Sequence, residues 1–287
     1  MDKIKQNHLN FTIQSKLKWC FLVISCILLF PASLYAQSGM SRDSTEYILA
    51  NSPAFSIYKD NYFITGTALG EEPSKYNSDI KFQFSFKQRL QNKPVFAGSY
   101  LYLTYTQKSF WDVYQASSPF TETNYNPGLM LAKPIYKDDK VRSMLMLSIE
   151  HESNGRDSIY SRSWNYIGIN YSHHFSSRIR ASLKLVIPFG LKDNPDLLKY
   201  NGLAEWQFTW DIKKEKLVLD IIGRKSAEWN TKGSLMTTIS FRPSPRRNLY
   251  WTLQWYQGYS ESLIDYREST NMLRVGLMFK PSFFRFY

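Results

Sequence analysis

The chain has 287 residues, of which 16% are aromatic and 21% are charged, and its formal net charge at pH 7 is +12. It has only two cysteines, Cys20 and Cys26, so a disulfide-rich scaffold is excluded. No nucleic-acid-binding motif accompanies the positive charge, which lipid phosphates would attract equally well, and we expect no nucleic-acid partner.

The first 36 residues predict a cleaved secretory signal peptide. Four lysines come before or at the edge of an apolar run, Phe21 to Phe30, and small residues follow it up to Ala36. Both cysteines fall inside this segment. No later stretch reaches the ~18 consecutive apolar residues that a membrane helix needs. A polar N-terminal arm, expected in the periplasm, covers residues 37–55.

Residues 56–287 predict strands, because apolar and polar residues alternate along them. Ile80 to Lys87 places four apolar residues on one face and four polar residues on the other. The same period of two recurs along residues 178–189 and 272–280. Twelve segments follow this pattern, near 57–67, 80–89, 98–109, 126–136, 141–151, 163–174, 178–189, 202–211, 216–224, 233–242, 247–257 and 271–280.

An even number of strands is what a closed antiparallel barrel requires, and long connections alternate here with short ones. The sequence therefore predicts a single all-β domain, a twelve-stranded transmembrane β-barrel with long extracellular loops and short periplasmic turns. The expected location is the bacterial outer membrane. A soluble β-sandwich also has alternating strands, but it accounts less well for strands near ~10 residues and for the alternation of loop lengths.

Three polar residues lie where two neighbouring strands meet a long loop. His151 and Ser153 continue the face of Ile149, and Asn165 shares the face of Ile167, so all three side chains are expected on the outer, lipid-facing side. A base, a nucleophile and an orienting group are what acyl transfer needs. From the spacing alone, the alternative that they are polar residues at the base of a loop stays open.

Several separated motifs make the chain resemble the outer-membrane phospholipase A family, whose members are twelve-stranded bacterial barrels. The N-terminal arm and the last few residues match this family poorly. The matching segments, in chain order, are Tyr105–Ser109, Ser117–Phe120, Glu122–Tyr125, His151–Asn165, Asp193–Asp196 and Gly258–Tyr266.

The resemblance implies a calcium-dependent phospholipase A1/A2 that hydrolyses phospholipid acyl esters, with lysophospholipase activity as an extension. By motif position, Ser153 would be the nucleophile, His151 the general base and Asn165 its orienting partner. The backbone amide of Gly155, together with calcium, would stabilise the oxyanion. The active site would face the outer leaflet.

The resemblance also implies the calcium ligands. Arg156 and Ser161 would offer backbone carbonyl oxygens, and Ser117 would contribute from a second subunit. Asp193 occupies the position of a ligand that the family uses in its monomeric form. Oxygen ligands of this mixed kind suit a hard cation.

Gln107 and Tyr105 share the lipid-facing parity of their strand, where a lone amide is unfavourable. The resemblance places this position in a homodimer interface that completes the site, so the protein is expected to be a homodimer when active and a monomer at rest. The alternative is that Gln107 lies close enough to the membrane boundary to be hydrated.

Two other functions are compatible with parts of the pattern. A small pore or structural barrel is the non-enzymatic alternative, but Trp206, Phe208, Trp210 or their neighbours would fill the lumen, and a pore needs no outward His-Ser-Asn set. An esterase that acts on lipopolysaccharide acyl chains remains open. Zinc is not expected, because HExxH is absent and the faces of His173 and His174 alternate.

Overall fold

The structure is a computed structural model that describes residues 40–226, 228 and 232–281. The predicted signal peptide, residues 1–36, and the first residues of the predicted arm lie outside the described residues. In the described part of the chain, no helix is both long and apolar enough to cross a membrane.

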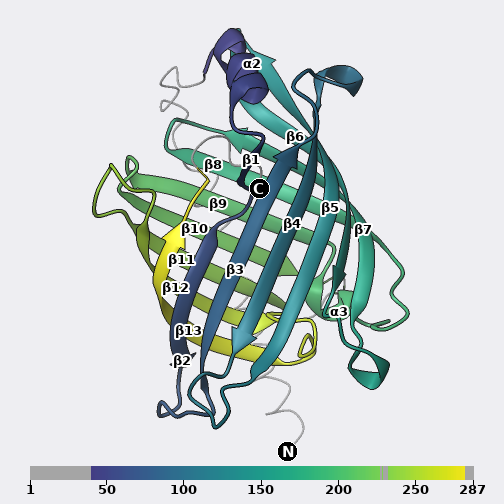
Figure 1. Cartoon of the computed structure of the whole chain (residues 1–287), viewed down its shortest axis with the longest axis vertical. Coiled ribbons are helices and arrows are strands. Elements are labelled where there is room, and N and C mark those ends of the chain that lie inside the picture. The colour runs from purple at the N-terminus through teal and green to yellow at the C-terminus, as the bar shows by residue number, and fades with distance from the viewer. Residues whose placement is uncertain (1–39, 227, 229–231, 282–287) are drawn as a thin grey trace, which may run out of the picture. The chain divides into compact units, whose positions relative to one another are not determined.

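The strands form one closed antiparallel barrel (Figure 1). β1 (Phe55–Ile57) and β2 (Asn61–Ala68) both pair with β3 (Ser78–Arg89), so they are two pieces of one barrel strand. β2 also pairs with β13 (Ser269–Phe279), which closes the ladder. Between them run β4 (Tyr100–Trp111), β5 (Phe120–Lys137), β6 (Lys140–Ser153), β7 (Ser163–His174), β8 (Ile179–Phe189), β9 (Ala204–Lys213), β10 (Leu217–Lys225), β11 (Gly233–Phe241) and β12 (Tyr250–Tyr259).

This arrangement confirms the twelve-stranded barrel that the alternation predicts. Apart from β1 and β2, which form one barrel strand together, each strand pairs with the next one along the chain. The largest difference in strand bounds is in β5, which begins at Phe120 and not near residue 126. Short helices lie in the connections: η2 (Phe96–Gly98), η3 (Ser158–Tyr160) and α3 (Leu198–Asn201).

The outer face of the barrel is apolar and the inner face is largely polar. On β6, Leu147 and Ile149 are 48% and 51% exposed on the outer face. Met146, which faces the barrel interior, is buried. Trp206 and Trp210 lie on the outer face, and their neighbours Gln207 and Thr209 are buried inside. The neighbours of the tryptophans, rather than the tryptophans, therefore fill the lumen.

A buried ion network crosses the barrel interior. Glu261, in the connection between β12 and β13, accepts from Lys81 Nζ at 2.9 Å and pairs with Arg274 Nη1 at 2.7 Å. Arg274 Nε also pairs with Asp79 at 2.7 Å. Because each charge has an opposite partner within hydrogen-bond distance, the network can be stable away from water. It fixes the β12–β13 connection to the barrel wall.

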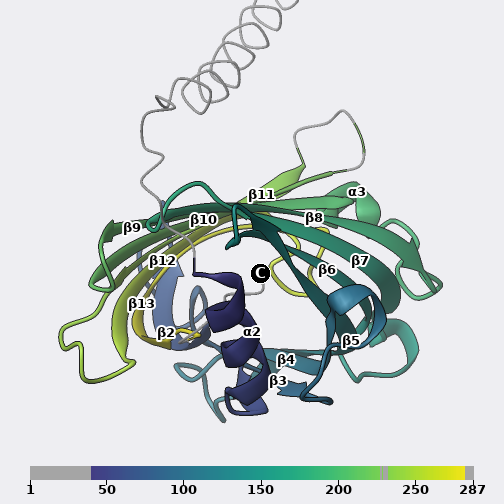
Figure 2. The ribbon, with the colours of Figure 1, turned by 90° about the horizontal axis from the view of Figure 1, so that it is seen from above.

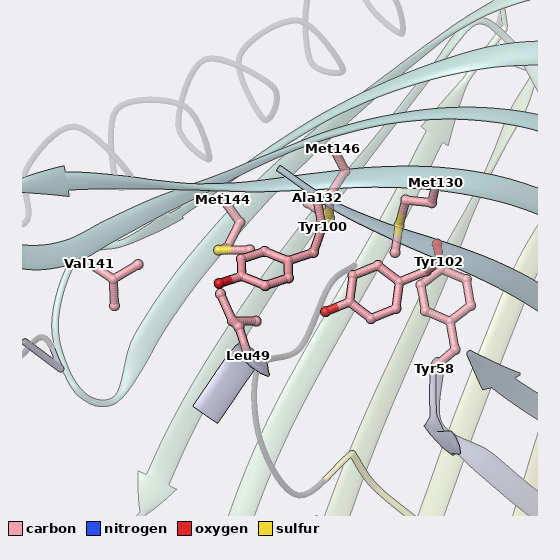
Figure 3. Close-up of a cluster of buried hydrophobic side chains, with 9 residues drawn as sticks. All are labelled: Leu49, Tyr58, Tyr100, Tyr102, Met130, Ala132, Val141, Met144 and Met146. Carbon is pink, nitrogen blue, oxygen red and sulfur yellow. The ribbon is translucent and has the colours of Figure 1, made fainter. Parts of the chain in front are cut away.

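The predicted polar arm contains a helix that was not among the predicted elements, α2 (Arg42–Asn51). The Ser41 hydroxyl caps it by accepting from the Ser44 amide. Figure 2 shows α2 across one opening of the barrel. Leu49 is 2% exposed and packs in a cluster with tyrosines and methionines of the barrel wall (Figure 3): Tyr58, Tyr100, Tyr102, Met130, Met144 and Met146.

The ion network predicts a stability defect for Glu261→Gln. The change leaves two buried cations short of one negative charge, and breaking such a pair costs about 3 kcal/mol or more. Burial alone would raise the pKa of Glu261, but Lys81 and Arg274 outweigh it and lower the pKa to about 2. The stabilisation is therefore complete above the ordinary value of 4.5 and is lost as the pH falls toward 2.

Urea unfolding in detergent micelles at neutral and acidic pH measures both effects. The matched control is Glu268→Gln, an exposed carboxylate a few residues further along. Equal unfolding midpoints for the two variants would contradict a stabilising role for the network.

Candidate active site

The ring of His151 is held by Asn165 across the β6–β7 ladder. The two residues are direct cross-strand partners, and His151 Nδ1 lies 2.9 Å from Asn165 Oδ1. An amide oxygen can only accept, so this bond requires the proton on Nδ1. In the neutral ring Nε2 is then left with a lone pair, which is the state that a general base needs.

Ser153 lies two residues beyond His151 on the same outward face, at a Cα separation of roughly 7 Å. Its backbone pairs with Ser163 on one side and Tyr125 on the other. Among the residues that the structure describes, its hydroxyl makes no hydrogen bond. The structure therefore joins His151 to Asn165 directly and brings Ser153 to the same half-buried edge of the sheet.

Two glycines beside these residues leave room that any side chain would fill. Gly155 has φ +67°, and a Cβ there would lie 3.0 Å from the ring of Tyr125. Gly190 also has φ +67°, and a Cβ would lie 2.6 Å from Asn165 Nδ2. Both positions favour glycine in conformation and in space. Of the two, only Gly155 was singled out from the sequence.

Asp193 connects two loops beside the site. Its Oδ2 accepts from Ser161 Oγ at 2.8 Å and from Ser163 Oγ at 3.1 Å. The bond from Ser161, followed by that from Ser163, lowers the pKa of Asp193, so the group is a carboxylate at neutral pH. The structure thus brings together two of the predicted metal ligands, Ser161 and Asp193.

The other predicted ligands lie in connecting loops. The guanidinium of Arg156 pairs with the buried Glu122 at 3.3 Å, which anchors the loop that carries its carbonyl. The Ser161 carbonyl accepts from Arg162 Nη1 at 2.8 Å, and Ser117 is exposed in a left-handed conformation (φ 64°).

Within residues 40–226, 228 and 232–281, no three His, Cys, Asp or Glu side chains gather as metal ligands would. A donor set of carbonyl and hydroxyl oxygens with one carboxylate still suits calcium, which is a hard cation.

The amide of Gln107 is not alone on the lipid face. Tyr105 Oη donates to its Oε1 at 3.0 Å, and its Nε2 donates to Ser109 Oγ at 3.3 Å. The expectation that Gln107 is a lone amide on the lipid face is therefore wrong, because neighbours two residues away on the same strand bond to it. The dimer interface at this position stays a prediction.

A second serine–histidine pair lies at the opposite end of β6 and β7. Ser143 Oγ is 2.8 Å from His173 Nδ1 and 2.8 Å from Tyr171 Oη. Ser143 is only 2% exposed, and its hydroxyl already has two partners. Ser143 is not among the predicted site residues, and this pair serves as an internal comparison for the site around Ser153.

A model of the family described as Phospholipase A1 matches residues 40–279. Phospholipase A1 of Escherichia coli strain K12 is 32% identical over 287 residues, covering 90% of this chain and 96% of that protein. Phospholipase A1 of Salmonella typhimurium is 31% identical over 290 residues, covering 89% and 98%.

Solved structures agree with these relatives. Outer membrane phospholipase A from Escherichia coli superposes with a TM-score of 0.70 at 28% identity, covering 83% of this chain and 99% of that chain. The Salmonella typhi outer membrane phospholipase, a dimer with bound calcium, gives a TM-score of 0.71 at 28% identity, covering 85% and 100%.

The His151–Asn165 bond predicts a fixed tautomer. In ¹⁵N-histidine-labelled protein at a pH where the rings are neutral, NMR should find the His151 proton on Nδ1. Asn165→Ala removes the only acceptor described for that proton, so both tautomers should then be populated. His173, whose Nδ1 faces a serine hydroxyl, is the control and should not change. An unchanged His151 spectrum in the variant would rule out the orienting role.

Proposed function

The chain belongs to the phospholipase A1 family, and on that premise we propose that Ser153, His151 and Asn165 hydrolyse phospholipid acyl esters at the outer face of the barrel. The family and the fold show that the protein is an acyl-ester hydrolase of the bacterial outer membrane. The observation that carries the proposal is the bond from His151 Nδ1 to Asn165 Oδ1 on the outward face.

His151 Nε2 takes the proton of Ser153 as the hydroxyl oxygen attacks the ester carbonyl. Asn165 holds the ring in the tautomer that this step needs, without the charge that a carboxylate would add. His151 then returns the proton to the leaving alcohol. Water attacks the acyl-enzyme with the same help from His151, which releases the fatty acid and restores the Ser153 hydroxyl. The amide of Gly155, two residues after the nucleophile, is the candidate donor to the oxyanion.

Calcium is the proposed cofactor. A relative of known structure is a dimer with bound calcium. The backbone carbonyl oxygens of Arg156 and Ser161 are the proposed ligands, and Asp193 is the proposed ligand of the monomeric form. Ser117 is the proposed calcium ligand that a second subunit contributes. Bound calcium would add electrostatic stabilisation of the oxyanion beside the Gly155 amide.

The substrate is expected to approach from the membrane. The row that leads to His151 and Ser153 continues through Leu147 and Ile149, whose side chains are exposed on the apolar outer face. An acyl chain can lie along such a row while its ester reaches the polar edge of the sheet. Esters of phospholipid and of lipopolysaccharide both lie near such an edge; the family favours phospholipid.

A homodimer is the proposed active form, with Tyr105 and Gln107 in its interface and the monomer as the resting form. The dimeric relative supports this proposal. Tyr105 and Gln107 are both half-buried on the outer face, so the bond between them could be exchanged for bonds to a second copy.

Ser153→Ala and calcium chelation are each expected to abolish fatty-acid release from micellar phospholipid. Loss of the nucleophile removes the covalent step, and loss of one oxyanion stabiliser lowers the rate by ~10² to 10³. Ser143→Ala, at the second serine–histidine pair, is the matched control and should keep full activity. Full activity of Ser153→Ala, or in the presence of chelator, would refute the respective part of the proposal.

Disulfide cross-linking of Gln107→Cys tests the dimer. The mature chain is predicted to have no other cysteine, so a cross-linked dimer should form under active conditions, with calcium and substrate analogue, and should diminish with chelator. Phe279→Cys on β13, also on the outer face, is the control. Equal cross-linking at the two positions, or none at 107, would argue against this interface.

A further inference from the structure

The ladder between β5 and β6 has a gap, and the gap faces His151. The register puts Pro127 opposite His151 and Asn126 opposite Glu152, yet neither pair forms. On its other side β5 pairs with β4 without interruption at these positions. The pairs that flank the gap are Tyr125 with Ser153 and Gly128 with Glu150.

The cause of the gap is the ring of Pro127. Proline has no backbone N–H. In an antiparallel ladder, the N–H at this position would donate to the carbonyl oxygen of His151. Without it, that oxygen would lack its partner on the β5 side.

The side chain of Asn126 supplies the missing donor. Its Nδ2 donates to the His151 carbonyl oxygen at 2.9 Å. Asn126 is 8% exposed, so water does not readily replace the bond. A side-chain amide thus takes over the role that the backbone of Pro127 cannot fill.

The amide of Asn126 is itself held by a buried network. Its Nδ2 also lies 3.3 Å from Tyr166 Oη, which donates to Glu150 Oε2 at 2.7 Å. Glu150 in turn accepts from Lys184 Nζ at 2.9 Å. The barrel interior therefore fixes the orientation of the amide that reaches His151.

We propose that Asn126 is a positioning residue for the general base, an inference that rests on the proposed function. His151 is held at two points: Asn165 on β7 fixes its ring, and Asn126 on β5 fixes its backbone. A base must be held within a fraction of an ångström of its productive position, and loss of one point lets the ring drift from Ser153.

The experiment uses Asn126→Ala, Pro127→Ala and the double variant, assayed on micellar phospholipid with saturating calcium. Asn126→Ala should lower kcat by roughly ten- to a hundredfold and leave KM nearly unchanged. Pro127→Ala alone should stay within about twofold of the unchanged protein. In the double variant the new backbone N–H of residue 127 can bond to the His151 carbonyl, so most of the lost kcat should return.

Asn126→Asp keeps the shape of the side chain but loses the Nδ2 donor, and it replaces Asn126→Ala if the alanine variant does not fold. Heat-dependent mobility in gels reports folding of each variant. An unchanged kcat in Asn126→Ala or Asn126→Asp would overturn the inference, and so would a double variant as slow as Asn126→Ala.

Ser153→Ala in the same assay distinguishes a failure of the proposed function from a failure of the positioning role alone. If Ser153→Ala is active, the proposed function fails. If Ser153→Ala is inactive and the Asn126 variants are as fast as the unchanged protein, only the positioning role fails.

Discussion

The rest of the structure depends on the closure of the ladder where β2 pairs with β13. A closed ladder leaves no unpaired strand edge, which is what allows backbone to lie in lipid. Closure also gives every strand one inner and one outer face, with side chains that alternate between them. The row through Leu147 and Ile149 is therefore outward along its whole length, and His151 and Ser153 are outward because they continue it.

The inside of the barrel is what makes its outer edge a rigid support. Lys184 on β8 pairs with Glu150 on β6, and Arg274 on β13 pairs with Glu261 in the β12–β13 connection. Trp164, beside Asn165, donates to Glu152 from within the barrel at 3.0 Å, directly behind the face that carries His151 and Ser153. His151, Ser153 and Asn165 lie at strand ends that pair with neighbouring strands and contact interior side chains. Side chains on such strands keep their relative positions better than side chains on a free loop.

The sequence was sufficient for the fold because a period of two, sustained over twelve segments, reports the environment of each strand face. The same alternation placed His151 and Asn165 on the outward face of neighbouring strands, whereas their direct cross-strand pairing is known only from the structure. The sequence could not reveal α2, whose apolar contact is mainly Leu49 against tyrosines far along the chain. Nor could it reveal the partners of Gln107 or the bond from Asn126 to the His151 carbonyl, because those depend on side-chain conformations.

The most direct test of the central claim is to find which serine is the nucleophile. The folded protein, in micelles with calcium, is treated with a long-chain alkylsulfonyl fluoride, and the adduct is located by mass spectrometry. The account predicts one adduct, on Ser153, that is lost in His151→Ala. An adduct on Ser143, which has its own histidine neighbour, or an undiminished adduct in His151→Ala would contradict it.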